Sequence, residues 1–123
     1  MNSNPSEVDA SILTLLSESI EEVLGSLLGD RAKQAIYLCL ERQGLQRHQI
    51  PEYLSRFEVF LEDNFGRAGG VIERQIAKRL YRGLGLDMVE VPYLALTDYV
   101  DIAFRRLSSD HTNSFRKPFP VAG

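Results

Sequence analysis

Apolar residues recur at every third or fourth position along most of the chain, which is the period of an amphipathic helix. The longest of these stripes lies near the N-terminus and consists of Val8, Ile12, Leu16, Ile20, Val23, Leu24 and Leu27. It predicts one long helix over about residues 6–28, which Gly25 could interrupt. Residues 1–5 precede the stripe and are expected to form a frayed end.

A second helix is predicted between two boundaries that contain glycine. Asp30 follows Gly29 and suits the N-cap, while Gly44 lies where a left-handed glycine often closes a helix. The apolar stripe between these boundaries comprises Ala32, Ala35, Ile36, Cys39 and Leu40. Residues 45–51 are then expected to be a connector with room for a single helical turn.

Two more helices are predicted on either side of Gly66. The third covers about residues 51–64, and its inner face comprises Leu54, Phe57, Phe60 and Leu61. The charged residues of this helix are expected to face water: Arg56, Glu58, Glu62 and Asp63. The fourth covers about residues 67–84, and its apolar face comprises Val71, Ile72, Ile76, Leu80 and Leu84.

The last predicted helix follows an ambiguous segment, residues 86–91, which also suits a short extended piece. Pro92 favours the first turn of a helix. The inner face of this helix comprises Tyr93, Leu96, Val100, Ala103, Phe104 and Leu107. Residues 109–123 form a polar, proline-containing tail. Because no segment longer than four residues alternates with period two, the predicted fold is all-α: a single-domain bundle of about five helices over residues 1–123.

Composition supports one globular domain and limits its partners. The 123 residues are 44% hydrophobic and 25% charged, which is enough apolar material for one core. The net charge of −3 gives no global attraction to nucleic acid or to acidic membranes. Cys39 is the only cysteine, and no apolar run approaches the roughly 18 residues of a membrane span. We therefore expect a cytoplasmic protein without membrane contact.

Residues that could carry chemistry are few. His48 and His111 are the only histidines, and with a single cysteine they are too few for a metal cluster, so both are expected to be solvated. Cys39 lies on the apolar stripe of the second helix and is expected to pack in the core as an inert thiol. We therefore expect no catalytic residue, no metal and no cofactor, and we do not expect an enzyme.

The glycine-rich sequence at residues 66–70 has two interpretations. A helix N-terminus can hold a phosphate group. A phosphate loop, however, also requires a preceding buried strand and a lysine followed by serine or threonine, and this sequence has neither. The favoured interpretation is a tight turn between two helices, where glycine permits a close approach of the backbones.

Charge is distributed unevenly. Residues 1–30 contain six acidic residues and no basic one, whereas residues 67–86 contain five basic residues and one acidic residue. Four of these basic residues define a basic ridge on the fourth helix: Arg67, Arg74, Lys78 and Arg82. The last three recur at i, i+4 and i+8 and share one face. The ridge could meet nucleic-acid phosphates, an acidic protein surface, or the acidic first helix of its own chain or of a second copy.

Several apolar and glycine positions follow one another in a specific order: Gly44-Leu45, Ile50-Pro51, Phe57, Leu61, Phe65-Gly66 and Ile72-Glu73. Over about residues 20–86 this order resembles the Nitrosopumilus output domain family. The sequence Arg67-Ala68-Gly69 departs from the family's usual order at its central turn. The resemblance implies a small helical output or regulatory module of archaeal signalling. The family has no defined catalytic residues, so none is carried over.

These patterns favour a helical module that binds another protein, either a different partner or a second copy as a homodimer. The expected interface is the wide apolar stripe of the first helix, represented by Leu13, Leu16 and Ile20. Phe115 and Phe119 flank two basic residues and could anchor the tail as an extended peptide on a partner, although a disordered end is the default expectation for such a segment. The alternative is a nucleic-acid-binding protein that uses the basic ridge.

Overall fold

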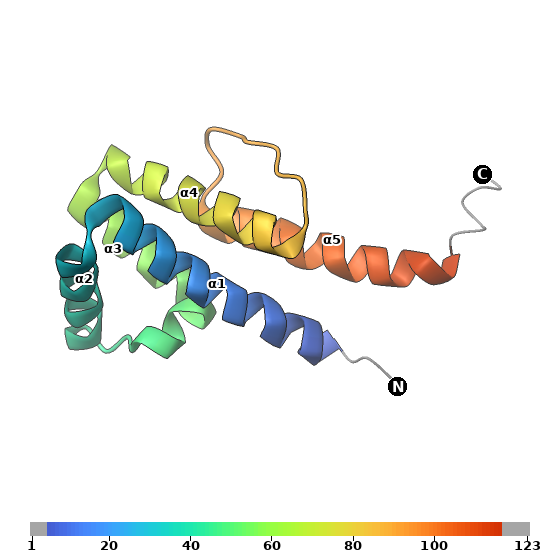
Figure 1. The fold of residues 1–123 in the computed structure, drawn as a ribbon, viewed down its shortest axis with the longest axis horizontal. Helices are drawn as coiled ribbons and strands as arrows, with labels where there is room; N and C mark the ends of the chain where they lie inside the picture. The colour runs from blue at the N-terminus through green and yellow to red at the C-terminus, as the bar shows by residue number, and fades with distance from the viewer. Residues whose placement is uncertain (1–4, 117–123) are drawn as a thin grey trace.

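A computed structural model describes the backbone of residues 5–116 and the side chains of residues 8–108. Over residues 5–116 every regular element is helical (Figure 1). The elements are α1 (Pro5–Leu28), α2 (Asp30–Arg42), the short 3-10 helix η1 (Arg47–Tyr53), α3 (Leu54–Phe65), α4 (Arg67–Leu84) and α5 (Leu96–Arg116). The predicted all-α bundle of five helices is therefore confirmed. The connector, expected to hold a single helical turn, instead leads into η1, a 3-10 helix of seven residues that continues to Tyr53.

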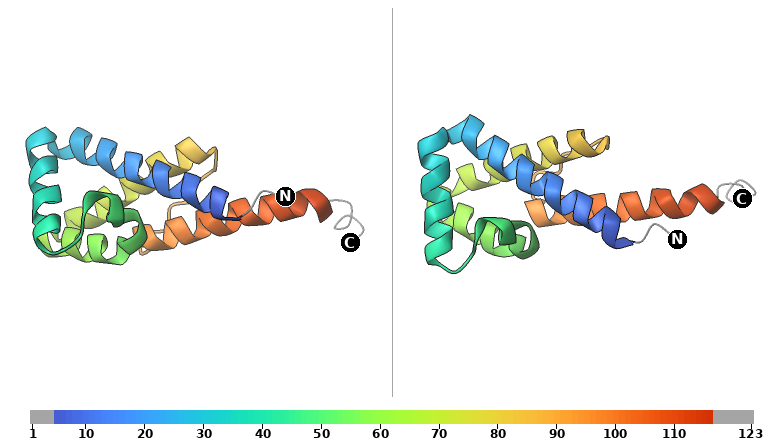
Figure 2. Two further views of the ribbon diagram at one scale, coloured as in Figure 1. Left: turned by 90° about the horizontal axis from the view of Figure 1, so that it is seen from below. Right: turned by 60° about the horizontal axis from the view of Figure 1, so that its bottom comes forward.

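The helices form a bundle from which α5 projects. α1 packs against α4 and α2, and α4 also packs against α3 and α5. α2 closes one end of the bundle, as both views in Figure 2 show. At the other end α5 continues past the remaining elements, so its C-terminal half extends away from the bundle (Figures 1 and 2). The predicted tail segment 109–116 therefore has a helical backbone up to Arg116.

The core consists mostly of the predicted apolar stripes. The four inner residues expected in α3 are all buried: Leu54, Phe57, Phe60 and Leu61. Two predicted faces are rotated from their expected position. Val71 of α4 is 47% exposed, and Ala77 and Tyr81 are buried on that helix instead. In α2 the buried residues are Ile36, Tyr37 and Leu40. Cys39 is exposed, so its predicted place in the core is wrong.

The ends of α2 test two capping predictions. Gly44 has φ +88, and its N–H donates to Glu41 O while the Leu45 N–H donates to Leu40 O, both at 2.9 Å. This is the Schellman arrangement that the glycine predicts. At the other end, Gly29 is the N-cap and Asp30 is already helical, so the Asp30 cap is wrong. α1 runs through Gly25 without interruption.

The glycines after Gly66 serve helix packing. A Cβ atom on Gly69 would lie 2.8 Å from the backbone oxygen of Leu61 in α3, a distance that real Cβ atoms essentially never show. α3 and α4 therefore approach each other at a point where only a glycine fits. This geometry agrees with the predicted tight helix–helix turn.

The start of α5 differs from its prediction. The helix begins at Leu96, and Pro92 lies in a turn four residues earlier. Tyr93, expected on the inner face, is 85% exposed. The physical reason is capping: the carboxylate of Asp98 accepts the N–H of Ala95 at 2.9 Å, as the acidic residue of a capping box does.

Candidate protein-contact surfaces

A groove lies between α1, η1, the start of α3 and α5. Its volume is about 340 Å³. Buried side chains form its floor: Pro51, Leu54 and Val100. More exposed apolar side chains form its walls: Leu13, Tyr53 and Phe104. We call this cavity the α1–α5 groove. Its open apolar walls are the kind of surface that binds other molecules.

Only part of the predicted interface of α1 lies at the surface of the chain. Leu16 and Ile20 are 0% and 1% exposed and belong to the core of the single chain, so they are not surface residues. Leu13 is half-buried and lines the α1–α5 groove. The stripe is wide because α1 packs against α2, α4 and α5, which cover most of it. The side chain of Phe115 and the whole of Phe119 lie outside the described residues.

A second apolar surface lies on the α4–α5 connection, residues 85–95. Its residues 86–91, for which a short extended piece was one expectation, form neither a helix nor a paired strand. Its exposed side chains include Val89, which is 77% exposed, and Tyr93. Three other apolar side chains of the connection pack against the core: Leu86, Met88 and Leu94. The exposed side chains are therefore presented on an anchored backbone.

Hydrogen bonds and an ion pair hold this connection in place. The Tyr99 hydroxyl accepts the N–H of Val91 at 2.9 Å and donates to its carbonyl oxygen at 3.1 Å. Arg106 donates to Asp87 O at 2.6 Å. The Lys78 ammonium lies 2.8 Å from the carboxylate of Glu90, and this hydrogen bond lowers the pKa of Glu90. The loop is thus tied to α4 and to α5.

Two carboxylates from other helices cap the N-terminus of α5. Glu73 of α4 is 3% exposed, and its Oε1 accepts the N–H of Leu96 at 3.1 Å. Glu58 of α3 accepts both the N–H and the hydroxyl of Thr97. The first N–H groups of a helix have no partner within the helix, so these carboxylates satisfy them. The expectation that Glu58 faces water is therefore wrong.

The second oxygen of Glu73 has no hydrogen-bond partner and is buried. The pKa of Glu73 is raised to about 7, mainly by burial. The carboxylates of Glu58 and Glu62 contribute to this rise, while the Leu96 N–H and Arg74 act in the opposite direction. The sequence held one indication of this burial. Glu73 lies four residues after Gly69 and three before Ile76, on the inner stripe of α4.

The basic ridge is partly neutralised within the chain. Lys78 is paired with Glu90, and Arg74 is half-buried. Arg67 and Arg82 are exposed and have no ion-pair partner among residues 8–108. Beside the ridge, Arg79 pairs with Glu22 of α1 at 2.9 Å. This is one of the contacts between basic α4 and acidic α1 that the charge pattern allowed.

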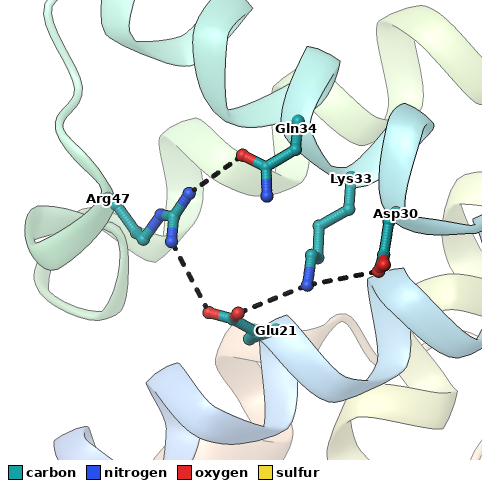
Figure 3. A network of polar contacts seen from close by, with 5 residues as sticks. All are labelled: Glu21, Asp30, Lys33, Gln34 and Arg47. Carbon is teal, nitrogen blue, oxygen red and sulfur yellow. Dashed lines mark hydrogen bonds and ion pairs between the residues drawn. The ribbon is translucent and has the colours of Figure 1, made fainter.

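A polar network joins α1, α2 and η1 at the closed end of the bundle (Figure 3). Lys33 lies 3.3 Å from Glu21 and 3.7 Å from Asp30. Arg47 lies 3.8 Å from Glu21 and donates to Gln34 at 3.3 Å. These contacts link the three elements at this end of the bundle.

The same arginine also covers an aromatic ring of α2. The guanidinium of Arg47 lies 4.0 Å from the ring centroid of Tyr37, within the range of a cation–π contact. The pKa of Tyr37 is raised to about 12, mainly by burial and also by the carboxylate of Glu21, while Arg47 opposes the rise. The network therefore includes a packing contact between Arg47 and the ring of Tyr37 at the closed end of the bundle.

In the part of the chain that the structure describes, few side chains could support a function other than protein contact. His48 is exposed, as expected, and the side chain of His111 is not described. Among the described residues no group of three or more histidine, cysteine, aspartate or glutamate side chains could hold a metal ion. No described helix has both the length and the apolar character needed to cross a membrane.

Comparison with family models, curated proteins and solved structures found no match for this chain. The fold and its surfaces define the class of the protein. It is an all-α domain of five helices with an apolar groove and an anchored apolar loop. The resemblance over residues 20–86 remains an interpretation of apolar and glycine positions.

Proposed function

We propose that this chain is a non-catalytic helical module that acts through protein–protein contact and associates with a second copy of itself. The observation that carries the proposal is the α1–α5 groove, whose apolar walls Leu13 and Tyr53 are accessible, with Tyr53 50% exposed. Apolar walls around a concave surface favour a partner that also buries apolar area. The exposed apolar residues of the α4–α5 connection support the same class of function.

A regulatory or signalling-output role in the archaeal cytoplasm is the finer part of the proposal. It rests on the family resemblance and on the single cysteine, Cys39, and not on any contact within the fold.

Self-association is tested by sedimentation of the full chain with Leu13→Asp and, separately, Tyr53→Ser. Each should weaken the dimer at least about tenfold, because a charge or a lost ring removes apolar contact at the interface. Val71→Asp is the matched control, since Val71 is 47% exposed on α4 outside the groove. A chain that is monomeric at every concentration, or a dimer indifferent to both groove variants with intact helicity, would contradict the proposal.

Nucleic-acid binding by the basic ridge is the competing proposal. The observation in its favour is the exposure of Arg67 and Arg82, whereas the pairing of Lys78 with Glu90 reduces the charge available. Binding through phosphates must weaken steeply as salt rises. A short duplex that increases the mass of the chain only at low salt would support this alternative. Binding that survives Arg74→Gln, Lys78→Gln and Arg82→Gln together would exclude the ridge.

A further inference from the structure

The α1–α5 groove has an acidic rim. The carboxylates of Glu52 in η1 and Asp101 in α5 line it, and both side chains are exposed. Arg56 is the one cation among the described residues of the lining, and its guanidinium donates to Gln43 O at 2.8 Å. An occupant that suits this groove combines apolar surface with positive charge.

The chain itself contains a segment of this chemistry. Residues 116–120 read Arg116-Lys117-Pro118-Phe119-Pro120 and bring together two cations, one aromatic ring and two prolines. Aromatic side chains contribute large contact areas at little cost in side-chain entropy. Prolines restrict a free peptide to extended conformations, which lowers the entropy lost on docking. The segment therefore matches both the walls and the rim of the groove.

Chain length decides which copy supplies this segment. Twelve helical residues separate Phe104 in the groove from Arg116, the last residue of α5. At 1.5 Å per residue they span roughly 18 Å. Phe119 follows Arg116 by three residues, which reach at most about 10 Å when fully extended. Three extended residues after Arg116 therefore fall short of Phe104 in the groove of the same chain, since α5 projects from the bundle as far as Arg116 (Figure 2).

We propose that the α1–α5 groove binds residues 116–120 of a second copy of this chain. Phe119 lies between the apolar walls, and Arg116 and Lys117 face Glu52 and Asp101 of the partner. Exchange in both directions gives a two-fold symmetric dimer in which each α5 crosses to the other copy. This inference rests on the proposed self-association and specifies the segment that produces it.

A charge swap in the full-length chain tests the ionic contacts. Arg116→Glu with Lys117→Glu should raise the dimer dissociation constant at least about tenfold in sedimentation, and Glu52→Lys with Asp101→Lys should do the same. The chain with all four changes should regain the original constant within about threefold. Glu41→Lys with Asp63→Lys, two exposed positions outside the groove, is the matched control and should have no effect. Tail variants that leave the constant unchanged would overturn the inference.

A labelled peptide of residues 114–123 tests the apolar contact by fluorescence anisotropy. It should bind the Phe119→Ser full chain, whose own tail no longer competes, and bind at least about tenfold more weakly when Leu13→Asp is added. A peptide carrying Phe119→Ser should also bind at least about tenfold more weakly. Equal binding of the two peptides, or no binding of either, would overturn the inference.

The two proposals fail in different ways. A dimer that responds to Leu13→Asp but not to any change in residues 116–119 would overturn the tail exchange and leave the proposed function standing. A chain that is monomeric at every concentration would overturn both.

Discussion

The closed end of the bundle and the start of α5 both join three elements through charged side chains, yet the two regions differ in burial. At the closed end, the side chains of Glu21 and Arg47 are 45% and 44% exposed. At the start of α5, Glu73 is almost completely buried and one of its oxygens has no partner. The closed end thus joins several polar side chains of which Glu21 and Arg47 are half-exposed to water. The start of α5 relies on fewer polar contacts, and Glu73 makes its contact away from water.

The difference teaches that the number of contacts does not determine their energetic weight. Ion pairs between solvated side chains contribute about 0–1 kcal/mol, because water competes for both partners. A buried polar group that loses its partner costs about 1–3 kcal/mol. The start of α5 should therefore respond more strongly to substitution than the network in Figure 3, although fewer groups meet there.

The largest expected effect concerns the charge of Glu73. Its pKa of about 7 in the folded chain exceeds the ordinary value of 4.5, so between these pH values the folded state binds a proton that the unfolded state releases. The free energy of unfolding should therefore fall as pH rises through this range, by about 1–3 kcal/mol. Glu73→Gln keeps an oxygen acceptor for Leu96 and removes the charge. This variant should show a flatter pH profile and greater stability above the pKa.

Urea unfolding followed by circular dichroism at a series of pH values measures this effect. Glu62→Gln is the matched control, because Glu62 is an exposed carboxylate that faces the same site from α3. It should leave most of the slope in place. A Glu73→Gln chain with the same pH dependence as the original would assign the slope to other groups and remove the contrast between the two regions.

The second effect concerns the anchored connection next to this site. Tyr99→Phe removes the hydroxyl that bonds both backbone groups of Val91, and the expected loss is about 1–2 kcal/mol. Hydrogen exchange should show faster exchange at the Val91 amide, while the amides of α1 keep their protection. Tyr93→Phe is the control, because the Tyr93 ring is 85% exposed. Equal exchange in both variants would mean that packing alone holds the connection.

The same contrast explains what sequence reasoning could predict. Long stripes of apolar residues predicted α1 and α3 within a few residues, because a helix that buries one face repeats that face every turn. Gly44 predicted the end of α2, because a left-handed backbone there favours glycine. The periodicity of apolar residues therefore identified these helices. Leu13, chosen from the same stripe of α1, lines the groove, although the sequence did not indicate the groove itself.

The start of α5 could not be predicted in this way. Besides the local contact of Asp98 with Ala95, it depends on Glu73 and Glu58, which come from two other helices and approach Leu96 and Thr97 only in the folded chain. Pro92 was the stronger local indication, and tertiary capping overrides it. Cys39 and Val71 illustrate the same limit. Both lie at the margins of their apolar stripes, where the packing partner determines how the helix is rotated about its axis and so whether the side chain is buried.

The smallest expected effect concerns the network at the closed end. Glu21 contacts both Lys33 and Arg47, but its side chain is 45% exposed. Glu21→Gln should therefore lower stability by no more than about 0.5 kcal/mol, and added salt should reduce the difference because it screens exposed charges. The pKa of Tyr37 should fall in this variant, since the Glu21 carboxylate raises it.

Urea unfolding at low and high salt, with an optical titration of Tyr37, measures both consequences. Glu18→Gln is the control, because Glu18 is exposed on the same helix and outside the network of Figure 3. A loss above about 2 kcal/mol that persists in high salt would be the behaviour of a buried polar group. The closed end would then lose as much free energy of unfolding on substitution as the start of α5, and the difference in solvent exposure would not explain how the two regions respond.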